Sequence, residues 1–346
     1  MLVLTSKPDD IAVACSLLRQ GKVVAVPTET VYGLAADCTD EKAVADIFRA
    51  KGRPADNPLI IHISELSQLE KYCTPNPWAE ALAEAFWPGP LTMILPKKDI
   101  VPGIVSAGLD TVAVRFPSHP TARRIISGCG VALAAPSANI SGSPSPTSAG
   151  HVIHDFSDNE YVSAVVDDGA CACGLESTVI DLSHDEPCLL RPGFVTPEMI
   201  ENVLGKIKVA RAVLEKLPED EKALSPGLKH RHYAPKAETV GVAGSTAAAV
   251  EYISENRGKN TFVICFDGEN GAFERLGMTA FCYGDPDRPE TMGNELFDAL
   301  RRADSSGADQ IFIRCKLVGG VGLAVYNRLL RAAGFNIVDA DREKGK

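Results

Sequence analysis

The sequence has none of the features that mark a membrane-spanning or disulfide-stabilised protein. Its apolar runs are all shorter than the roughly 20 residues that cross a bilayer. The first ten residues, MLVLTSKPDD, lack a basic segment followed by an apolar one, so we expect no secretory signal. Ten cysteines in a chain of this length do not indicate a disulfide framework, and the one close pair, Cys171 and Cys173, is too tightly spaced for the usual zinc or redox motifs. We therefore expect reduced thiols, no protein-bound metal and a cytoplasmic location.

Motifs for nucleotide binding and covalent catalysis are missing as well. The 346 residues contain neither a Gly-rich dinucleotide fingerprint nor a P-loop, so a nucleotide would have to bind through another arrangement. The serines have no obvious His and Asp partners, which argues against a covalent intermediate. The chemistry that remains is phosphoryl or nucleotidyl transfer, which depends mostly on positioning and charge stabilisation.

Positive charge is scarce in the first part of the chain. Residues 1–205 hold 14 Lys and Arg against 25 Asp and Glu, whereas residues 206–346 hold 21 against 20. A broad nucleic-acid groove needs a basic face, so this balance argues against one. A few arginines that converge inside one cavity remain compatible with it, and they would suit a small anionic ligand.

The length and composition predict a globular α/β protein of two domains. Short apolar strands interspersed with helices predict a twisted mixed open sheet over residues 1–205. Residues 206–238 are rich in Pro, Gly and basic residues and predict a linker, in which His230 and His232 show no zinc spacing. Residues 239–346 predict a smaller three-layer, Rossmann-like α/β domain.

The stretch 26–62 organises the first domain. A buried strand over 22–26 precedes a hydroxyl-rich turn, and apolar residues at helical spacing follow up to Gly52 and Pro54, which end the helix. A second strand over 59–63 carries His62. The other predicted helices are 9–20, 66–72, 78–86, 121–126 before Gly128, one after 148, 196–205, 247–253, 292–303 and 322–333. The other predicted strands are 91–95, 111–116, 131–135, 162–166, 178–182, 188–191, 239–242, 261–266 and 310–314.

A Ser- and Pro-rich segment follows the strand over 131–135. Residues 136–147, PSANISGSPSPT, are typical of a surface loop. The alternative is a phosphate site lined by hydroxyls and amides, with Thr147 or Ser148 capping the next helix. Composition alone leaves both interpretations open.

Four cations are candidates for the anionic ligand. Lys51 and Arg53 could be ordinary solvated charges, but Arg115 and Arg191 each end a predicted strand and precede a proline. Strand ends with a following turn are where α/β sheets place ligand sites. Together with the Ser/Asn loop, these cations would hold a polyphosphate and its Mg²⁺.

Seven motifs in order resemble the long, two-domain form of the YrdC-type threonylcarbamoyl-AMP synthases. The signature of that family is a K-x-R pair, Lys51 and Arg53, with an S-x-N triplet, Ser137 to Asn139. The motifs are PTETVYGLAADC (27–38), KGRPADNPLIIH (51–62), AVRFP (113–117), APSANISGSPSPT (135–147), ESTVID (176–181), LLRPG (189–193) and SPGLKHRHYAP (225–235).

The resemblance implies a YrdC-like sheet with a central cavity and a synthase that joins L-threonine, bicarbonate and ATP into threonylcarbamoyl-AMP and pyrophosphate. The product would serve threonylcarbamoyladenosine formation in tRNAs that read ANN codons, by hand-off to a tRNA threonylcarbamoyltransferase. The threonine amine would take up CO₂, and the carbamate oxygen would attack the α-phosphate. No covalent enzyme intermediate is needed.

The resemblance also implies residue roles. The expected threonine ligands are Thr30, His62, Arg115, Ala135 through its backbone, and Ser177. The expected ATP ligands are Lys51, Arg53, Asn57, Thr111, Ser137, Asn139, Ser145, Arg191 and Tyr233. Lys51, Arg53 and Arg115 are the expected catalytic residues. Tyr233 would fold back over the nucleotide, so that the linker acts as a lid.

Simpler interpretations stay open for several residues and for the whole protein. His62 could be a core histidine, Thr30 a turn residue and Tyr233 a packing residue. The chain could instead be a non-catalytic protein that binds double-stranded RNA or matures ribosomes, although its acidic first part argues against that. Carbamoyl transfer as in hydrogenase maturation is a third interpretation, but those proteins carry zinc-finger and acylphosphatase modules that are absent from this sequence.

Overall fold

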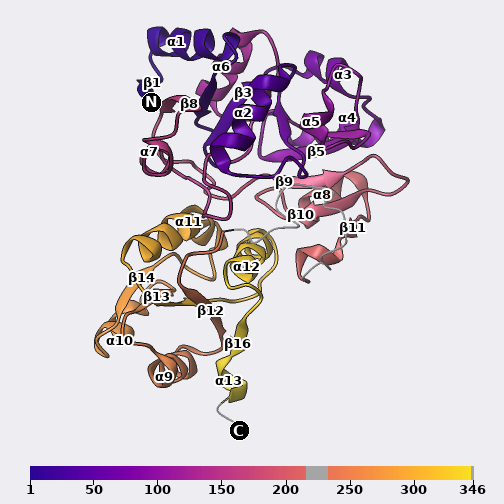
Figure 1. The fold of residues 1–346 in the computed structure, drawn as a ribbon. Helices are drawn as coiled ribbons and strands as arrows, with labels where there is room; N and C mark the ends of the chain where they lie inside the picture. Colours follow the sequence, from indigo (N-terminus) through magenta and orange to yellow (C-terminus); the bar gives the residue numbers. More distant parts are fainter. Residues whose placement is uncertain (216–232, 344–346) are drawn as a thin grey trace. The chain divides into compact units, whose positions relative to one another are not determined.

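The computed structural model describes residues 1–215 and 233–343, and Figure 1 draws the chain as a ribbon. The chain divides into two compact units. The first comprises Met1–Ser141 and Ser145–Lys229, and the second comprises Gly142–Pro144 and His230–Lys346. Most of the predicted linker, from 216 to 232, lies outside the described residues.

The first unit alternates short strands and helices, in agreement with the mixed α/β expectation. Its strands are β1 (Leu2–Thr5), β2 (Val23–Val26), β3 (Gly33–Asp37), β4 (Ile60–His62), β5 (Leu91–Pro96), β6 (Thr111–Arg115), β7 (Leu133–Ala134), β8 (Val162–Asp167), β9 (Thr178–Asp181), β10 (Cys188–Arg191) and β11 (Lys208–Val209). Its helices are α1 (Pro8–Arg19), α2 (Glu41–Lys51), α3 (Leu69–Tyr72), α4 (Pro77–Phe86), α5 (Gly103–Ser106), α6 (Pro120–Cys129), α7 (Ala149–Phe156) and α8 (Pro197–Leu204), with 3₁₀ turns η1 (Leu66–Gln68) and η2 (Arg211–Val213).

These strands form one mixed sheet in the order β1-β8-β2-β3-β7-β4-β6-β5-β9-β10-β11. The central strands β4 and β6 run parallel, and their register places His62 opposite Arg115. Strand β5 runs antiparallel to β6 and places Thr92 opposite Arg115 on the other side. Three polar residues therefore lie in one row across three neighbouring strands.

Both faces of the sheet are buried, which explains the apolar character of its central strands. Along β2, Val24 and Val26 pack in a core with α1 and α6, whereas Val23 and Ala25 pack in the core that contains α2, α4 and α7. Successive side chains of a strand point to opposite faces, so a strand covered on both sides is apolar throughout. Helix α2 ends as predicted, because Gly52 adopts the left-handed conformation (φ 60°) after Lys51.

The second unit is a three-layer α/β domain, as expected (Figure 1). Its five strands are all parallel, in the order β14-β13-β15-β12-β16. Helices α9, α10 and α13 pack on one face of the sheet, and α11 and α12 lie together on the other. The elements are β12 (Glu238–Ala243), α9 (Thr246–Asn256), β13 (Thr261–Cys265), α10 (Asn270–Glu274), β14 (Thr279–Cys282), α11 (Pro289–Ser305), β15 (Gln310–Arg314), α12 (Val321–Ala332), β16 (Ile337–Asp339) and α13 (Ala340–Glu343).

Three residues from the Ser/Pro segment belong to this second unit. Arg301 of α11 donates a hydrogen bond from Nη2 to the carbonyl of Pro144 (2.6 Å), and the Ala234 amide donates to the carbonyl of Gly142 (3.0 Å). Arg301 is largely buried at this contact. The predicted surface loop is therefore held by hydrogen bonds over these residues, one of them buried.

The prediction that helix 121–126 ends before Gly128 is wrong. Helix α6 continues to Cys129, and Gly130 provides the left-handed end at φ 74°. A side chain at Gly128 would place its Cβ 2.7 Å from the sulfur of Cys15 in α1. Glycine is needed there because α1 and α6 approach closely, not because the helix ends.

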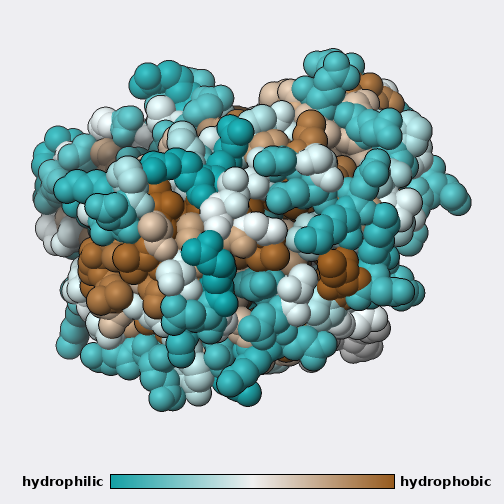
Figure 2. Space-filling view, turned by 90° about the horizontal axis from the view of Figure 1, so that it is seen from above, coloured by the Kyte–Doolittle hydropathy of each residue, from teal (hydrophilic) through white to brown (hydrophobic). Residues whose placement is uncertain are grey.

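The described residues contain no helix that is both long and apolar enough to cross a membrane. Figure 2 shows one face of the molecule, which is largely hydrophilic with a few separate apolar patches. Scattered exposed apolar side chains of this kind are normal on protein surfaces.

Candidate active site

The row formed by His62, Arg115 and Thr92 marks the candidate site. His62 and Arg115 are the last residues of the parallel strands β4 and β6, so both lie at the carboxyl ends where α/β sheets bind ligands. All three side chains are buried, with 5%, 3% and no exposed surface for His62, Arg115 and Thr92. Buried polar groups need partners, and those of Arg115 come from a distant turn.

The Arg115 guanidinium is held by the turn that follows β2. Its Nη1 donates to Thr30 Oγ1 (2.8 Å), and its Nη2 lies 2.7 Å from Glu29 Oε1. Thr30 Oγ1 in turn lies 2.9 Å from Thr28 Oγ1. The structure thus brings together two of the predicted threonine ligands, Thr30 and Arg115. It also adds Glu29, which was not predicted.

Glu29 is a buried carboxylate in this site. Besides its ion pair with Arg115, its Oε1 accepts a hydrogen bond from the Ser118 amide (3.1 Å), and its Oε2 is buried without a hydrogen-bond partner. Burial alone would raise the pKa of Glu29, but the charge and hydrogen bond of Arg115 outweigh it and hold the pKa below its usual value. Glu29 is therefore ionised at neutral pH.

His62 is a neutral histidine beside that ion pair. Burial, reinforced by the charge of Arg115, lowers the pKa of His62 to about 3. Its Nδ1 is buried and has no hydrogen-bond partner. The ring can therefore offer a ligand one hydrogen bond, but it brings no charge.

Ser177 and Arg191 meet at the next strands of the sheet. Ser177 Oγ lies 2.7 Å from Thr92 Oγ1, and Arg191 donates to Ser177 through Nε to the carbonyl (3.0 Å) and Nη2 to Oγ (3.2 Å). Gly193 makes this possible, since a Cβ there would lie 2.5 Å from the Thr178 amide nitrogen. The RPG turn thus packs directly on the ESTVID segment.

Lys51 holds the loop that carries Ser137 and Asn139. Its ammonium donates to the carbonyls of Ser137 (2.5 Å) and Asn139 (2.7 Å), and its own carbonyl accepts from the Ser141 amide (2.9 Å). Lys51 is only 2% exposed, so the solvated-charge interpretation is wrong for it. The loop also joins the sheet, because Ala135 donates its amide to the carbonyl of Ile60 (3.0 Å).

Arg53 and Asn57 form the basic turn before β4. Arg53 donates from Nη2 to the Asn57 carbonyl (3.0 Å), and its guanidinium lies 5.9 Å from the centre of the Phe48 ring. Asn57 is 1% exposed, yet neither Oδ1 nor Nδ2 has a hydrogen-bond partner. A buried amide with both ends unsatisfied is unusual in a folded protein and indicates a ligand position.

The remaining predicted residues are more dispersed. Ser145 Oγ donates to Glu176 Oε1 (2.5 Å), and both residues are buried. Thr111 is the first residue of β6 and lies about 13 Å along the strand from Arg115, at 3.3 Å per residue. Tyr233 belongs to the second unit, where it is buried with its ring 5.1 Å from that of Phe297.

The Ser/Pro segment lacks the predicted helix cap. Helix α7 begins after Ser148, but neither Ser148 nor Thr147 caps it. The Ser148 side chain makes no capping hydrogen bond, and the Thr147 hydroxyl accepts none from an amide of the helix. The Thr147 amide instead donates to His151 Nδ1 (3.2 Å). Capping by either residue was therefore a wrong prediction.

Sequence reasoning missed Glu29, Thr92 and Glu176. Glu29 and Glu176 carried one usable signal: each is an acidic residue beside hydroxyl residues in a motif next to a buried strand. Thr92 carried none, because its role depends on the β5–β6 register.

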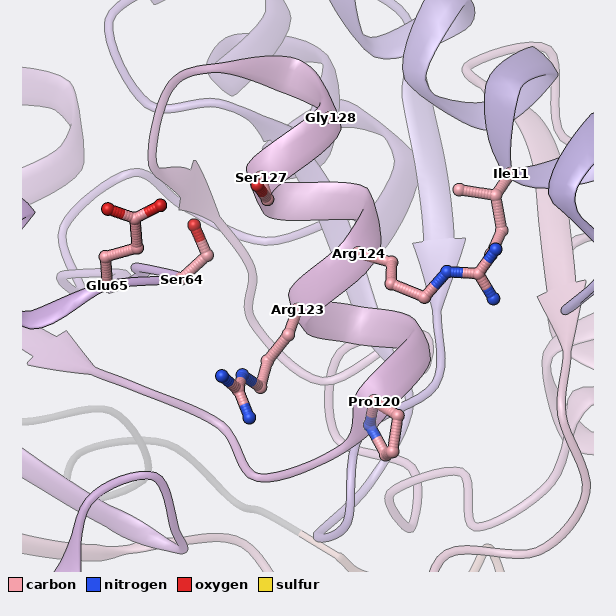
Figure 3. Close-up of a pocket in the computed structure, with 8 residues that line it drawn as sticks. All are labelled: Ile11, Ser64, Glu65, Pro120, Arg123, Arg124, Ser127 and Gly128. Carbon is pink, nitrogen blue, oxygen red and sulfur yellow. The ribbon is translucent and has the colours of Figure 1, made fainter.

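A separate pocket of about 640 Å³ lies along α6, and none of the predicted site residues lines it. Figure 3 shows Arg124 extending toward Ile11 of α1, whereas Arg123 points to the other side of α6. Arg124 donates to the Ser6 carbonyl (3.2 Å), and Arg123 lies 5.0 Å from the Phe116 ring centre. Both arginines are exposed, whereas Arg115 is buried among the predicted ligands, so we place the chemistry at Arg115.

Two protein families match this chain. The family described as telomere recombination, Sua5/YciO/YrdC, matches residues 16–193. The family described as the threonylcarbamoyl-AMP synthase C-terminal domain matches residues 195–334. Between them, the two matches cover most of the chain.

Curated relatives and a solved structure agree with these matches. The threonylcarbamoyl-AMP synthase of Pyrococcus abyssi is 47% identical over 335 residues, which is 95% of each chain. The enzyme of that name from Bacillus subtilis is 44% identical and covers 97% of this chain and 96% of its own. The crystal structure of P. abyssi Sua5 complexed with L-threonine superposes with a TM-score of 0.89 at 44% identity, covering 98% of this chain and 99% of that one.

Proposed function

The chain belongs to the threonylcarbamoyl-AMP synthase family, and on that premise we propose how its residues perform the reaction. It is an enzyme that makes threonylcarbamoyl-AMP from L-threonine and ATP, in the service of tRNA modification. One observation carries the residue roles. The Arg115 guanidinium is buried between Thr30 and Glu29, beside a neutral His62, at the ends of two parallel strands.

Threonine binds in this row. The Arg115 guanidinium provides the cation for its carboxylate, because a planar fork matches a carboxylate better than a single ammonium does. Thr30, the unsatisfied Nδ1 of His62, the hydroxyl of Ser177 and the backbone at Ala135 provide hydrogen bonds around it. Because His62 is neutral, the positive charge that attracts the threonine carboxylate comes from Arg115 and not from His62.

ATP binds along the K-x-R turn and the S-x-N loop. Asn57, with two unsatisfied amide atoms, has unused capacity to bind a ligand, and Arg53 lies beside it. Lys51 acts by holding the carbonyls of Ser137 and Asn139, which fixes the loop against the phosphates. Arg191, a proposed ATP ligand, donates a hydrogen bond to Ser177, a proposed threonine ligand, and so connects the two binding sites. Thr111, Ser145 and Tyr233 complete the proposed ATP set.

Bicarbonate is the third substrate in this proposal. The threonine ammonium and bicarbonate give a carbamate, water and a proton: an N–C bond forms, and a C–O bond of bicarbonate breaks as water leaves. A carbamate oxygen then attacks the α-phosphorus, and the bond to the pyrophosphate leaving group breaks. Arg53 and Arg191 stabilise the charge that develops on the phosphates, and no residue of the chain forms a covalent bond to substrate.

Mg²⁺ enters with ATP in this proposal. The described residues contain no group of three or more His, Cys, Asp or Glu that could hold a metal ion, so the ion would be bound through phosphate oxygens. It would neutralise phosphate charge during the transfer. The protein's part is to place the phosphates beside Arg53.

The larger arrangement is also a proposal. Residues 1–205 form the catalytic domain, 206–238 a linker that acts as a lid through Tyr233, and 239–346 the C-terminal domain. The product is a mixed anhydride that water destroys, so a lid would protect it until release. We place the reaction in the cytoplasm, with hand-off to a tRNA threonylcarbamoyltransferase.

A conservative change at Arg115 tests the threonine assignment. Arg115→Lys keeps a positive charge beside Glu29 but removes the guanidinium fork, so we expect kcat/KM for threonine to fall about a hundredfold. The KM for ATP should change far less. Arg123→Lys, on the exposed side of α6, is the matched control and should behave like the wild type. Equal threonine kinetics in Arg115→Lys and the wild type would refute the assignment.

A further inference from the structure

We propose that Glu29 binds the amino group of threonine through Oε2, so that Glu29 and Arg115 together recognise the zwitterion. This inference rests on the proposed threonine site and adds to it the group that receives the reacting nitrogen. Three features of the site support it: the atoms that the ion pair leaves unsatisfied, the charge of Glu29, and the match to the geometry of an amino acid.

Three atoms of the ion pair have no hydrogen-bond partner: the acceptor Glu29 Oε2 and the donors Nε and Nη2 of Arg115. Glu29 Oε1 forms the ion pair with Arg115 Nη2 and accepts a hydrogen bond from the Ser118 amide, whereas Oε2 is buried and has no hydrogen-bond partner. On the arginine, Nη1 donates to Thr30 Oγ1, whereas Nε and Nη2 are buried without a hydrogen-bond partner, Nη2 having only its ion-pair contact with Glu29. Buried polar atoms are nearly always satisfied in native proteins, so these atoms indicate a ligand position.

The charges of the pair match an amino acid. A carboxylate and an ammonium are attached to the same carbon of threonine, only a few ångströms apart, as Glu29 and Arg115 are in the site. The guanidinium would bind the carboxylate and Glu29 Oε2 the ammonium. Glu29 is 7% exposed, and its remaining oxygen is an acceptor that can satisfy only a donor.

The inference also has a chemical consequence. The amine donates through N–H both as the zwitterion and, after N–C bond formation, as the carbamate. An acceptor at this position would therefore hold the nitrogen in one orientation before and after that bond forms. Glu29 acts here as an orienting ligand, since an ionised carboxylate that Arg115 stabilises is a weak base.

A purely structural Glu29, which only positions Arg115, is the competing explanation. The two explanations differ in one respect. A structural role predicts that any ligand with the threonine carboxylate loses affinity when Glu29 changes. An ammonium-binding role predicts that only ligands with the amine do.

Glu29→Gln distinguishes the structural role from the ammonium-binding role, because glutamine has nearly the same shape as glutamate. The glutamine oxygen can still accept from Arg115 Nη2 and the Ser118 amide, while an NH₂ replaces Oε2 and cannot accept from an amine. The full-length protein is titrated calorimetrically, with a non-hydrolysable ATP analogue present. The ligands are L-threonine and the 2,3-dihydroxybutanoate that has a hydroxyl in place of the amine.

We expect wild-type protein to prefer threonine by about tenfold or more, the size of a charge-assisted hydrogen bond. In Glu29→Gln, threonine should weaken about tenfold, whereas dihydroxybutanoate should change by less than about twofold. Glu84→Gln, on the exposed side of α4, is the control and should match the wild type. Equal weakening of both ligands in Glu29→Gln would overturn the proposal.

Two further measurements keep the result decisive. If Glu29→Gln fails to fold, the test is whether the wild-type protein binds threonine more tightly than dihydroxybutanoate. Equal affinity for the two ligands overturns the proposal. Glu29→Asp, which retains the charge but shortens the side chain, should then lose part of that preference. Pyrophosphate release by the same wild-type preparation is measured separately, so a failure of the proposed reaction is not confused with a failure of ammonium binding.

Discussion

His62 is buried in its neutral form, and this determines how the first unit responds to acid. Its folded pKa of about 3 lies below the ordinary value of 6.5, so the unfolded chain takes up a proton first as the pH falls. The stability contributed by neutral burial is therefore complete above pH 6.5 and is lost progressively between pH 6.5 and 3.

The corresponding prediction concerns wild type and His62→Gln. Between pH 8 and pH 5 the wild type should lose about 2 kcal/mol of unfolding free energy relative to the variant, at 1.36 kcal/mol per pH unit. Urea unfolding at both pH values measures this. The pKa of Glu29 in the folded protein lies below its usual value, so its carboxylate is still ionised at pH 5. It therefore contributes little to the change in unfolding free energy between pH 8 and pH 5. An identical pH response of the two proteins would contradict the neutral burial of His62.

The pairing of Glu29 with Arg115 could not be predicted from the sequence. They lie 86 positions apart, and nothing local indicates that they pair. Arg115 was predicted because it ends an apolar strand before a proline, whereas the β4–β6 register that sets it beside His62 could only come from the fold.

At the level of elements, the RPG turn after β10 positions Arg191. Gly193 packs against Thr178 so closely that a Cβ would lie 2.6 Å from its Oγ1. Any side chain there must push the turn away, and Arg191 would then lose its hydrogen bonds to Ser177. The turn is thus a positioning element for two site residues.

Gly193→Ala should therefore reduce kcat/KM for ATP by about tenfold or more, since a misplaced catalytic group has large kinetic effects. Gly103→Ala is the control, because a Cβ at Gly103 meets nothing within 4 Å. Steady-state kinetics of both variants give the comparison. Wild-type activity in Gly193→Ala would show that Arg191 does not depend on this turn.

Elements with strong local signals were predictable, and those set by distant partners were not. The buried strand β2 and the end of α2 at Gly52 follow from apolar runs and stop residues. Strand β3, Gly33–Asp37, was missed because its small residues have weak strand preference, although it pairs with the nearby β2 as well as with the distant β7. Strand β1, LVLT, was missed because its partner β8 lies about 160 residues away.

At the scale of the whole molecule, each of the two units has its own sheet and core. The first holds most of the proposed ligands, whereas Tyr233 lies in the second. Gly142–Pro144, just before Ser145, also belongs to the second unit through Arg301 and Ala234. The proposal that Tyr233 binds ATP therefore concerns a residue of the second unit.

Deletion of residues 225–346 tests this proposal. The shortened protein retains the core of the first unit and should fold, which circular dichroism would check. Its kcat/KM for ATP should fall about tenfold or more, because the lid residue Tyr233 and the contacts of Gly142–Pro144 are lost. Full activity in the shortened protein would refute a catalytic role for the lid.

The central claim is that one site adenylates threonine that has been carboxylated on its amine. The most direct measurement is pyrophosphate release from ATP, with L-threonine and bicarbonate omitted in turn. The account predicts release only when both are present, with threonylcarbamoyl-AMP formed in equal amount. Pyrophosphate or phosphate release that is indifferent to threonine would contradict it, and so would the absence of turnover with all three substrates.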